Sequence, residues 1–354
     1  MNISILIPTK DRPDFILRLL KYYASSNFKG LIFIGDSSSS DLFETNKLNI
    51  KRYKKYLSIE HYHDPEAGMF EMSSYLCSAV KTDYSVIVND DDVVLTKSLY
   101  ACVDFLSKNK DYSAAHGKAI QIGMEGGKCK AFSKITMIKR YSLQTIKKDT
   151  PLERVGEYFD TLANLNMAVI RAEVNKYAYA KASQLDKYNS SYIFGELVHA
   201  SIVCIKGKVG QVDEYGLLRQ YHDQQFYTQQ SLIEWVSGEK WCDSFNFLKS
   251  TMCQELVSSS DSTQLVASNE VSAILSRWVS AILVNISTKN SSSNNTNDTL
   301  KNTLKKISIL RFIVRKLRQI LDFSSTKTSL SRFTKKDKLT DDVISYLNIV
   351  QKKR

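Results

Sequence analysis

Short apolar runs alternate with segments of helical apolar spacing along the first hundred residues of the chain. Runs of strand length lie at 2–7, 30–34, 57–62 and 84–88, and helical spacing lies at 15–23 and 70–80. Pro8 is expected to end the first strand, and Asp11 or Asp14 can cap the helix that follows it. Strands and helices in this order predict a parallel, doubly wound α/β sheet.

Polar residues follow each of the four predicted strands. They are Thr9, Lys10, Asp11 and Arg12 after the first, Asp36 and Ser37 after the second, Asp64 after the third, and Asp90, Asp91 and Asp92 after the fourth. In doubly wound sheets, ligands bind beyond the carboxyl ends of the strands. Polar groups at all four ends therefore predict a ligand site at this edge of the sheet.

The three consecutive aspartates are the most informative of these groups. Adjacent carboxylates repel one another and are costly to remove from water, so a buried strand that ends in them needs compensation. A divalent cation with oxygen ligands, Mn²⁺ or Mg²⁺, supplies it and also neutralises charge on a leaving diphosphate. The alternative is a solvated acidic turn in which Asn89 or Asp90 caps the next helix.

The other strand-end candidates each have a structural alternative. Asp36 can accept hydrogen bonds from a base or a ribose, or it can stabilise its own turn as a cap. Thr9 and Arg12 can contact a nucleotide or form a plain turn before a helix. His61 and His63 lie on one face of a strand, where a structural role is favoured over a metal cluster.

Two further candidates lie later in the chain. Glu196 is a lone acid in apolar surroundings, where a raised pKa would suit a general base. A helix-surface glutamate is the alternative. His222 closely follows Arg219 and can ligate a metal or contact a phosphate, or it can be a surface histidine.

Several motifs resemble those of the family 2 type of nucleotide-sugar glycosyltransferases, which have the GT-A fold. Residues 5–12 (ILIPTKDR) resemble the family's opening strand and Pro-Thr-x-Asn-Arg turn, residues 34–37 (IGDS) its Asp-Asp-Gly-Ser turn, and residues 86–92 (VIVNDDD) its D-x-D metal motif. Glu196 lies where the family places its catalytic acid, and residues 218–222 loosely resemble its late Tyr-Arg-x-His element. The resemblance covers roughly residues 1–225.

The resemblance implies a metal-dependent, inverting glycosyltransferase. Its donor would be a nucleoside-diphosphate sugar, most often a UDP-sugar, and its acceptor a glycan or a lipid-linked glycan in surface polysaccharide assembly. It assigns Glu196 as the general base and Asp90 and Asp92 as metal ligands, with His222. The nucleotide contacts that it implies are Pro8, Thr9, Arg12, Asp36, Asp90 and Arg219.

The chain departs from the family pattern at three positions. Gly35 replaces the first aspartate of the second turn, which leaves nucleotide recognition to Asp36. Asn89 stands where an aspartate is common, which favours Asp90 and Asp92 as the D-x-D pair and leaves Asp91 open. Glu196 is followed by a leucine and not by an aspartate.

The sequence after residue 110 is less regular. Strands are predicted at 114–122, 166–170 and 209–217, a helix that runs into a buried strand at 192–204, and helices at 229–288. The expected organisation is a GT-A domain at 1–225, a helical extension at 226–288, a Ser/Asn-rich linker at 289–300 and a basic tail at 301–354.

Basic charge is concentrated at the end of the chain. The net charge is +12, but residues 301–354 hold 15 Lys/Arg and 4 Asp/Glu, so residues 1–300 are close to neutral. Residues 301–321 have an apolar and a basic helical face, which suits peripheral contact with an anionic membrane or packing on the body. Few aromatic residues are interleaved with the basic ones, so no nucleic-acid partner is expected.

Composition excludes several other classes. The six cysteines form no C-x-x-C pair, which argues against a zinc ribbon and favours reduced thiols in the cytoplasm. No uncharged run approaches the roughly 18 residues that span a bilayer. The remaining alternatives are a nucleotidyltransferase, which would need a phosphate-binding glycine-rich loop that is not evident, and a non-catalytic GT-A-like binding protein.

Overall fold

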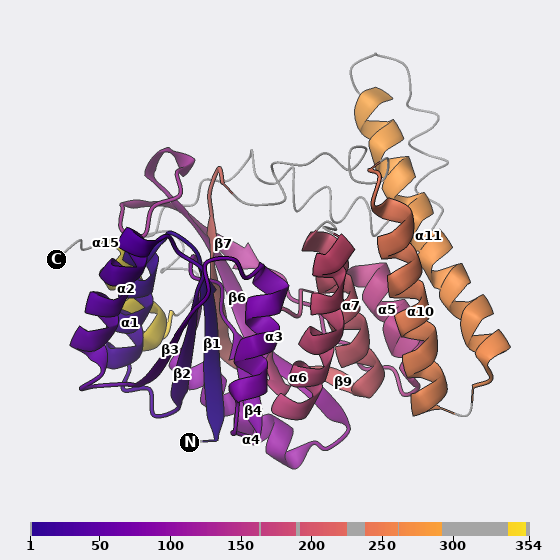
Figure 1. Ribbon diagram of the computed structural model, residues 1–354, viewed down its shortest axis with the longest axis horizontal. Coiled ribbons are helices and arrows are strands. Elements are labelled where there is room, and N and C mark those ends of the chain that lie inside the picture. Colours follow the sequence, from indigo (N-terminus) through magenta and orange to yellow (C-terminus); the bar gives the residue numbers. More distant parts are fainter. Residues whose placement is uncertain are drawn as a thin grey trace.

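The computed structural model describes residues 2–162, 164–188, 192–224, 238–260, 262–291 and 339–351. These residues form an α/β fold in which one mixed sheet lies between two layers of helices (Figure 1). Helices α1, α2 and α15 cover one face of the sheet, and α3, α6 and α7 cover the other.

The first half of the sheet is parallel, as the sequence predicts. Its strands are β1 (Ile3–Thr9), β2 (Leu31–Asp36), β3 (Ser58–His63) and β4 (Tyr84–Ile87), in the order β3-β2-β1-β4. All three of these pairings are parallel. The carboxyl ends of the four strands therefore share one edge.

The second half of the sheet is mixed. Its strands are β5 (Val93–Val94), β6 (Tyr112–Met124), β7 (Ile135–Tyr141), β8 (Val169–Arg171) and β9 (Lys208–Tyr221). β8 pairs antiparallel with both β4 and β6, whereas the long β6 and β9 run parallel to each other. β5, which follows the aspartates, pairs antiparallel with β9.

The helices connect and cover these strands. They are α1 (Pro13–Ser25), α2 (Ser40–Tyr53), α3 (Met69–Ala79), α4 (Thr96–Lys108), α5 (Pro151–Thr161), α6 (Ala172–Ala182), α7 (Tyr192–Lys206), α10 (Trp241–Ser259), α11 (Gln264–Ser291) and α15 (Asp341–Gln351). Two short 3₁₀ turns lie at Glu125–Gly127 and Ser183–Tyr188.

Side chains of β1 alternate between two hydrophobic cores. Ile3, Ile5 and Ile7 pack in the core formed with α1, α4 and α15, whereas Leu6 packs in the core formed with α3, α6 and α7. This alternation is the two-residue period of a strand that is buried on both faces. It explains why the run reads as continuously apolar.

Pro8 does not end the first strand, contrary to the sequence expectation. β1 continues through Pro8 to Thr9, which pair with Gly35 and Asp36 of β2. The carbonyl of Leu6 accepts a hydrogen bond from Val88, so residues 6 and 8 direct their backbone groups toward the β4 side. β4 has ended at Ile87 there, so no ladder partner is lost at the proline.

The buried strand expected at the end of 192–204 is also wrong, because α7 continues as a helix to Lys206. Residues 202–205 are each at most 1% exposed. They pack in the core that α7 shares with α5, α6 and α10, so the last turn of this helix is buried on all sides. A short apolar run does not by itself distinguish a buried helix from a buried strand.

The C-terminal part of the chain is helical where it is described. α10 and α11 form the expected helical extension, and α11 continues to Ser291, past the expected start of the linker at 289. The predicted amphipathic segment 301–321 lies outside the described residues. Beyond it, α15 returns to the body and packs beside α1 (Figure 1).

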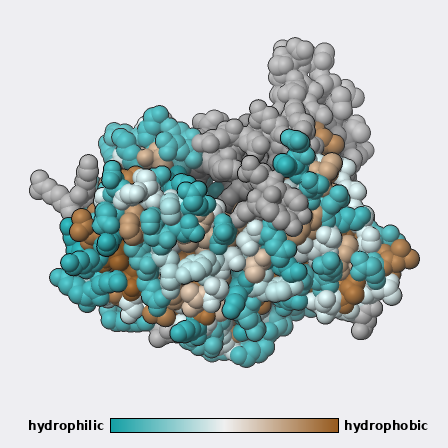
Figure 2. Space-filling model, viewed as in Figure 1, coloured by the Kyte–Doolittle hydropathy of each residue, from teal (hydrophilic) through white to brown (hydrophobic). Residues whose placement is uncertain are grey.

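The face of the molecule seen in Figure 2 is mainly polar. Figure 2 shows hydrophilic residues over most of this face and apolar residues at the lower tip of α11. The first turn of that helix carries two exposed apolar side chains, Leu265 and Val266. Among the described residues, no helix combines the length and the apolar character needed to cross a membrane.

Candidate active site

The carboxyl ends of β1 and β4 bring together groups that are about eighty residues apart in the chain. We call residues 89–92 the aspartate turn. The hydroxyl of Thr9 donates to Asp90 Oδ2 at 2.7 Å. The guanidinium of Arg12 lies 3.0 Å from Asp90 Oδ1 and 3.2 Å from Asp91 Oδ2. The two polar clusters predicted to share this edge are therefore in direct contact.

The end of β9 closes the other side of the aspartate turn. The pairing of β5 with β9 brings residues 220–222 beside the aspartates. The backbone N–H of Gln220 donates to Asp92 Oδ1 at 2.7 Å, and Nε2 of His222 donates to Asp91 Oδ2 at 2.9 Å. His222 is fully buried and is not the surface histidine of the alternative interpretation.

Arg18 supports the turn from behind and was not recognised from the sequence. Its side chain is fully buried, and Nη2 donates to the carbonyl oxygens of Asp91 at 2.7 Å and Asp90 at 3.4 Å. Nη1 donates to Gln220 Oε1 and to the carbonyl oxygen of Ala131. The available signal was its position on the apolar face of a predicted helix, three residues after Phe15.

Burial and mutual repulsion dominate the electrostatics of the turn. Burial, followed by the charge of Asp91, raises the pKa of Asp90 and of Asp92. Burial also raises the pKa of Asp91, but the hydrogen bond from His222 and the charge of Arg12 outweigh it and lower the pKa overall. Negative charge is therefore held most firmly on Asp91, the central residue.

Part of the compensation that the sequence argument assigned to a metal comes from the protein. Arg12 forms an ion pair with two of the carboxylates, and Arg18 and Arg219 act on Asp92 through space. Arg219 is held by the hydroxyl of Tyr141 at 2.7 Å. The acidic turn is thus surrounded by arginine side chains. This arrangement suits an anionic ligand that binds together with a cation.

The donor set fits a divalent cation that completes its shell with ligand oxygens. Among the described residues there is no group of three His, Cys, Asp or Glu side chains that could hold a metal ion. Mg²⁺ typically needs only one or two carboxylates together with phosphate oxygens and water. Hydrogen bonds engage both oxygens of Asp90 but one oxygen each of Asp91 and Asp92. Asp91 therefore joins the predicted pair, Asp90 and Asp92, as a candidate ligand of the cation.

His222 has both ring nitrogens engaged in the protein. Nε2 donates to Asp91, and Nδ1 accepts the backbone N–H of Gln224 at 3.2 Å. In this arrangement the ring positions the Asp91 carboxylate. Its predicted role as a metal ligand would require the bond to Asp91 to be exchanged for one to the cation.

Asp36 lies at the end of β2 and is fully buried. It accepts hydrogen bonds from the backbone of Ser38 at 3.0 Å, from Asn46 at 2.8 Å and from His61 at 3.1 Å. Burial raises its pKa, but these bonds outweigh burial and lower it overall. In this geometry Asp36 organises the loop after β2, and its contact with a nucleotide stays a prediction.

Glu196 lies in the first turns of α7 and is half-buried. The preceding residue, Gly195, packs so closely on Phe70 that an added Cβ would lie 2.3 Å from the ring. Phe70 belongs to the first turn of α3, which follows the carboxyl end of β3. Glu196 is thereby placed at the same end of the sheet as the aspartate turn.

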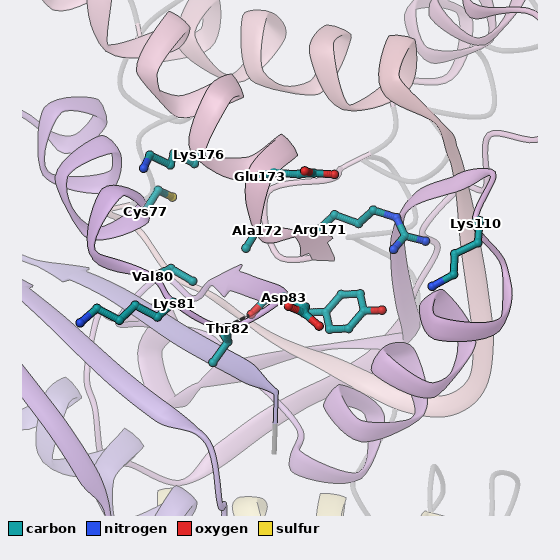
Figure 3. Close-up of a pocket in the computed structure, with 11 residues that line it drawn as sticks. Cys77, Val80, Lys81, Thr82, Asp83, Lys110, Arg171, Ala172, Glu173 and Lys176 are labelled. Carbon is teal, nitrogen blue, oxygen red and sulfur yellow. Dashed lines mark hydrogen bonds between the residues drawn. The ribbon is translucent and has the colours of Figure 1, made fainter.

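A cavity of about 420 Å³ lies at the opposite end of the sheet. Figure 3 shows it between the start of β4 and the start of α6, lined by charged side chains that include Lys81, Asp83 and Arg171. Arg171 donates to three backbone carbonyls near the end of α4, which is a structural role. No residue of the aspartate turn lines this cavity, so it is separate from the candidate active site.

Comparison with known proteins identifies the fold class. No protein-family model matches the chain, and no curated protein sequence matches it. Solved structures do match, and they confirm the expected GT-A fold with C-terminal helices.

TarS from S. aureus is among the proteins whose solved structures match. The structure of its residues 1–349 in complex with UDP-GlcNAc aligns with a TM-score of 0.54 at 15% identity, covering 100% of this chain and 93% of that chain. A second TarS structure aligns with a TM-score of 0.53 at 13% identity. There the alignment covers 99% of this chain but 55% of that chain, so this chain spans about half of that protein.

Proposed function

We propose that the chain is a nucleotide-sugar glycosyltransferase that takes its sugar from a UDP-linked donor. The observation that supports this best is the convergence of Thr9, Arg12 and His222 on the aspartate turn at the carboxyl edge of a GT-A sheet. The fold is shared with TarS, which has been solved with UDP-GlcNAc. Ligands bind at this edge in open α/β sheets.

In this proposal, Mn²⁺ or Mg²⁺ is held by the aspartate turn, through Asp92 and Asp90 or Asp91. The cation would neutralise the charge that develops on the departing diphosphate. Arg12 and Arg219 bind the diphosphate electrostatically, and Thr9 stays with Asp90. Arg12 is only partly buried and joins two of the carboxylates, so it can exchange one of them for a phosphate oxygen.

Glu196 is proposed to act as the general base. It takes the proton from the acceptor hydroxyl while that oxygen forms a bond to the anomeric carbon. The bond from the anomeric carbon to the diphosphate oxygen breaks on the opposite side, and the bonding pair leaves with UDP. The configuration is therefore inverted, and the acceptor is a glycan or a lipid-linked glycan.

Titration with UDP in the presence and absence of Mn²⁺ tests the donor site. We expect binding that requires the metal and an affinity about tenfold or more lower in Asp92→Ala. Asp104→Ala, on the exposed face of α4, is the matched control and should bind like the wild type. Metal-independent binding, or full affinity in a folded Asp92→Ala variant, would refute the proposal.

The general base is tested by Glu196→Gln. Transfer should fall by about 10²- to 10⁴-fold, the usual contribution of a general base, while UDP binding is retained. Glu173→Gln, at the far end of the sheet, should keep full activity. The released product distinguishes the two enzyme classes. A glycosyltransferase releases UDP from a UDP-sugar, whereas a nucleotidyltransferase would release pyrophosphate.

We also propose that residues 301–321 contact an anionic membrane surface. The support is their basic amphipathic pattern, with each basic residue worth about 1 kcal/mol near such a surface. Removing residues 301–321 while keeping α15 should abolish sedimentation with anionic vesicles. Undiminished sedimentation would contradict membrane contact through this segment.

A further inference from the structure

Helix α15 contacts Arg18 and the start of α4, the two groups that flank the aspartate turn, although about 250 residues separate it from the turn in the chain. We propose that α15 is a positioning element of the candidate active site and fixes both ends of the segment that contains the aspartates. The expected effect on ligand binding rests on the proposed function, whereas the effect on the turn itself does not. Two sets of contacts support the proposal.

The first set acts through Arg18. Arg18 donates to the carbonyl oxygens of Asp90 and Asp91, and so fixes the backbone from which the carboxylates project. Its guanidinium lies over the ring of Tyr346 in α15, 5.7 Å from the ring centroid, and over Phe15 at 4.8 Å. These two rings exclude water from a fully buried cation and strengthen its interaction with the carbonyls.

The second set acts at the start of α4, four to five residues after the turn. The N-cap of α4, Leu95, has no side-chain oxygen to accept the free N–H groups of the first turn. Asp342 of α15 accepts the N–H of Lys97 at 3.2 Å. The hydroxyl of Tyr22 accepts the N–H of Thr96 at 3.0 Å and donates to Asp342 at 2.6 Å.

α15 is seated firmly enough to act in this way. Four apolar side chains on one of its faces are at most 2% exposed: Val343, Tyr346, Leu347 and Val350. The ring of Tyr346 packs edge-on against Tyr22, with centroids 5.4 Å apart. The carbonyl of Val350 accepts a hydrogen bond from Ser133 at 3.1 Å. α15 is therefore part of the core behind the site.

The arrangement fixes residues 90–97 at both ends from a single helix. Arg18 and the ring above it hold the carbonyls of the turn, while Tyr22 and Asp342 hold the first turn of α4. Between these two anchors lie Asp92 and the short strand β5. Loosening α15 should therefore release the aspartates locally before the rest of the sheet responds.

Tyr346→Leu is the decisive variant, with Tyr346→Phe as its matched control. The Tyr346 hydroxyl is buried and has no hydrogen-bond partner among the described residues, so the phenylalanine keeps everything that acts on Arg18. Hydrogen exchange on the ligand-free full chain is the first readout. We expect exchange at residues 89–97 to be about fivefold or more faster in Tyr346→Leu, with α10 and α11 unchanged.

UDP affinity in Mn²⁺ is the second readout. We expect Tyr346→Leu to bind about fivefold or more weakly and Tyr346→Phe to bind like the wild type. If Tyr346→Leu does not fold, Asp342→Asn replaces it, because it weakens the contact with α4 and leaves the apolar face of α15 intact.

Equal exchange at 89–97 in the leucine and phenylalanine variants would overturn the proposal. An increase spread evenly over the whole sheet would also overturn it, because that result assigns α15 only a general stabilising role. A wild-type chain that fails to bind UDP would instead refute the proposed function. The exchange measurement would still decide the role of α15 in that case.

Discussion

The negative charge of the aspartate turn is compensated by side chains from other parts of the chain, which the run of aspartates does not identify. Three adjacent aspartates after a buried strand require compensation, and a divalent cation was the simplest source. The structure adds Arg12, Arg18 and His222, each in contact with the turn. A metal remains a proposal, and its role becomes that of bringing a diphosphate into a site already balanced by arginines.

Asp36 allows a residue-level prediction. The Asp36 carboxylate accepts three hydrogen bonds. In Asp36→Asn, the new side-chain amide N–H would face one of the three groups that donate to Asp36. We expect the free energy of unfolding to fall by about 1–3 kcal/mol, as measured by urea denaturation. Asp64→Asn, at the exposed end of the next strand, should change it little.

UDP binding by the folded Asp36→Asn variant then decides between the two roles of the residue. A structural role leaves the affinity within about tenfold of the wild type, because the carboxylate is fully buried. A larger loss of UDP affinity, measured while the variant is fully folded, would favour direct contact with the nucleotide.

At the level of elements, the close approach of α7 to α3 fixes the position of Glu196. Gly195 permits that approach, because Phe70 occupies the space that a side chain would need. Because α7 is a long and mostly apolar segment, its sequence does not indicate that position 195 needs a residue without a side chain. The position of Glu196 therefore depends on a helix–helix contact as well as on its own helix.

Gly195→Ala should destabilise the protein by about 1–3 kcal/mol, because the added methyl group overpacks the contact with Phe70. It should also reduce transfer more than UDP binding, since α7 carries the proposed base. Gly156→Ala in α5 is the matched control. Its Cβ would lie 3.9 Å from the nearest atom, so this change should stabilise by about 0.5–1 kcal/mol. Similar unfolding energies for the two variants would contradict the prediction.

At the scale of the whole molecule, the two cores meet at the sheet and are sealed by segments from opposite ends of the chain. α1 and α15 close one core, and α10 and α11 extend the other. Among the buried polar groups beside the core that α10 and α11 extend is His199 of α7, which donates to Asn175 at 2.9 Å. This histidine makes the stability of the whole fold dependent on pH.

Burial lowers the pKa of His199 to about 3, so the folded protein keeps the ring neutral. The unfolded chain binds a proton near pH 6.5, so this site stabilises the unfolded state as the pH falls from about 6.5 toward 3. The cost at pH 5 is about 2 kcal/mol relative to pH 7.

His199→Gln keeps a donor for Asn175 but does not titrate. The variant should therefore lose about 2 kcal/mol less unfolding free energy than the wild type between pH 7 and pH 5. Urea denaturation at both values measures the difference. Parallel losses in the two proteins would show that another group controls the acid sensitivity.

The sequence by itself determined the four parallel strands, the carboxyl edge with its polar groups and the aspartates, because strand period and strand ends are local properties of the chain. It misread Pro8 and the end of α7, where the neighbours of a residue decide its structure. Only the tertiary structure decided which groups surround the aspartates. Gln220 reaches Asp92 through its backbone, which has no sequence signal, and Asp342 reaches α4 from 245 residues away. Such contacts follow from strand pairing and helix packing, and local patterns do not encode them.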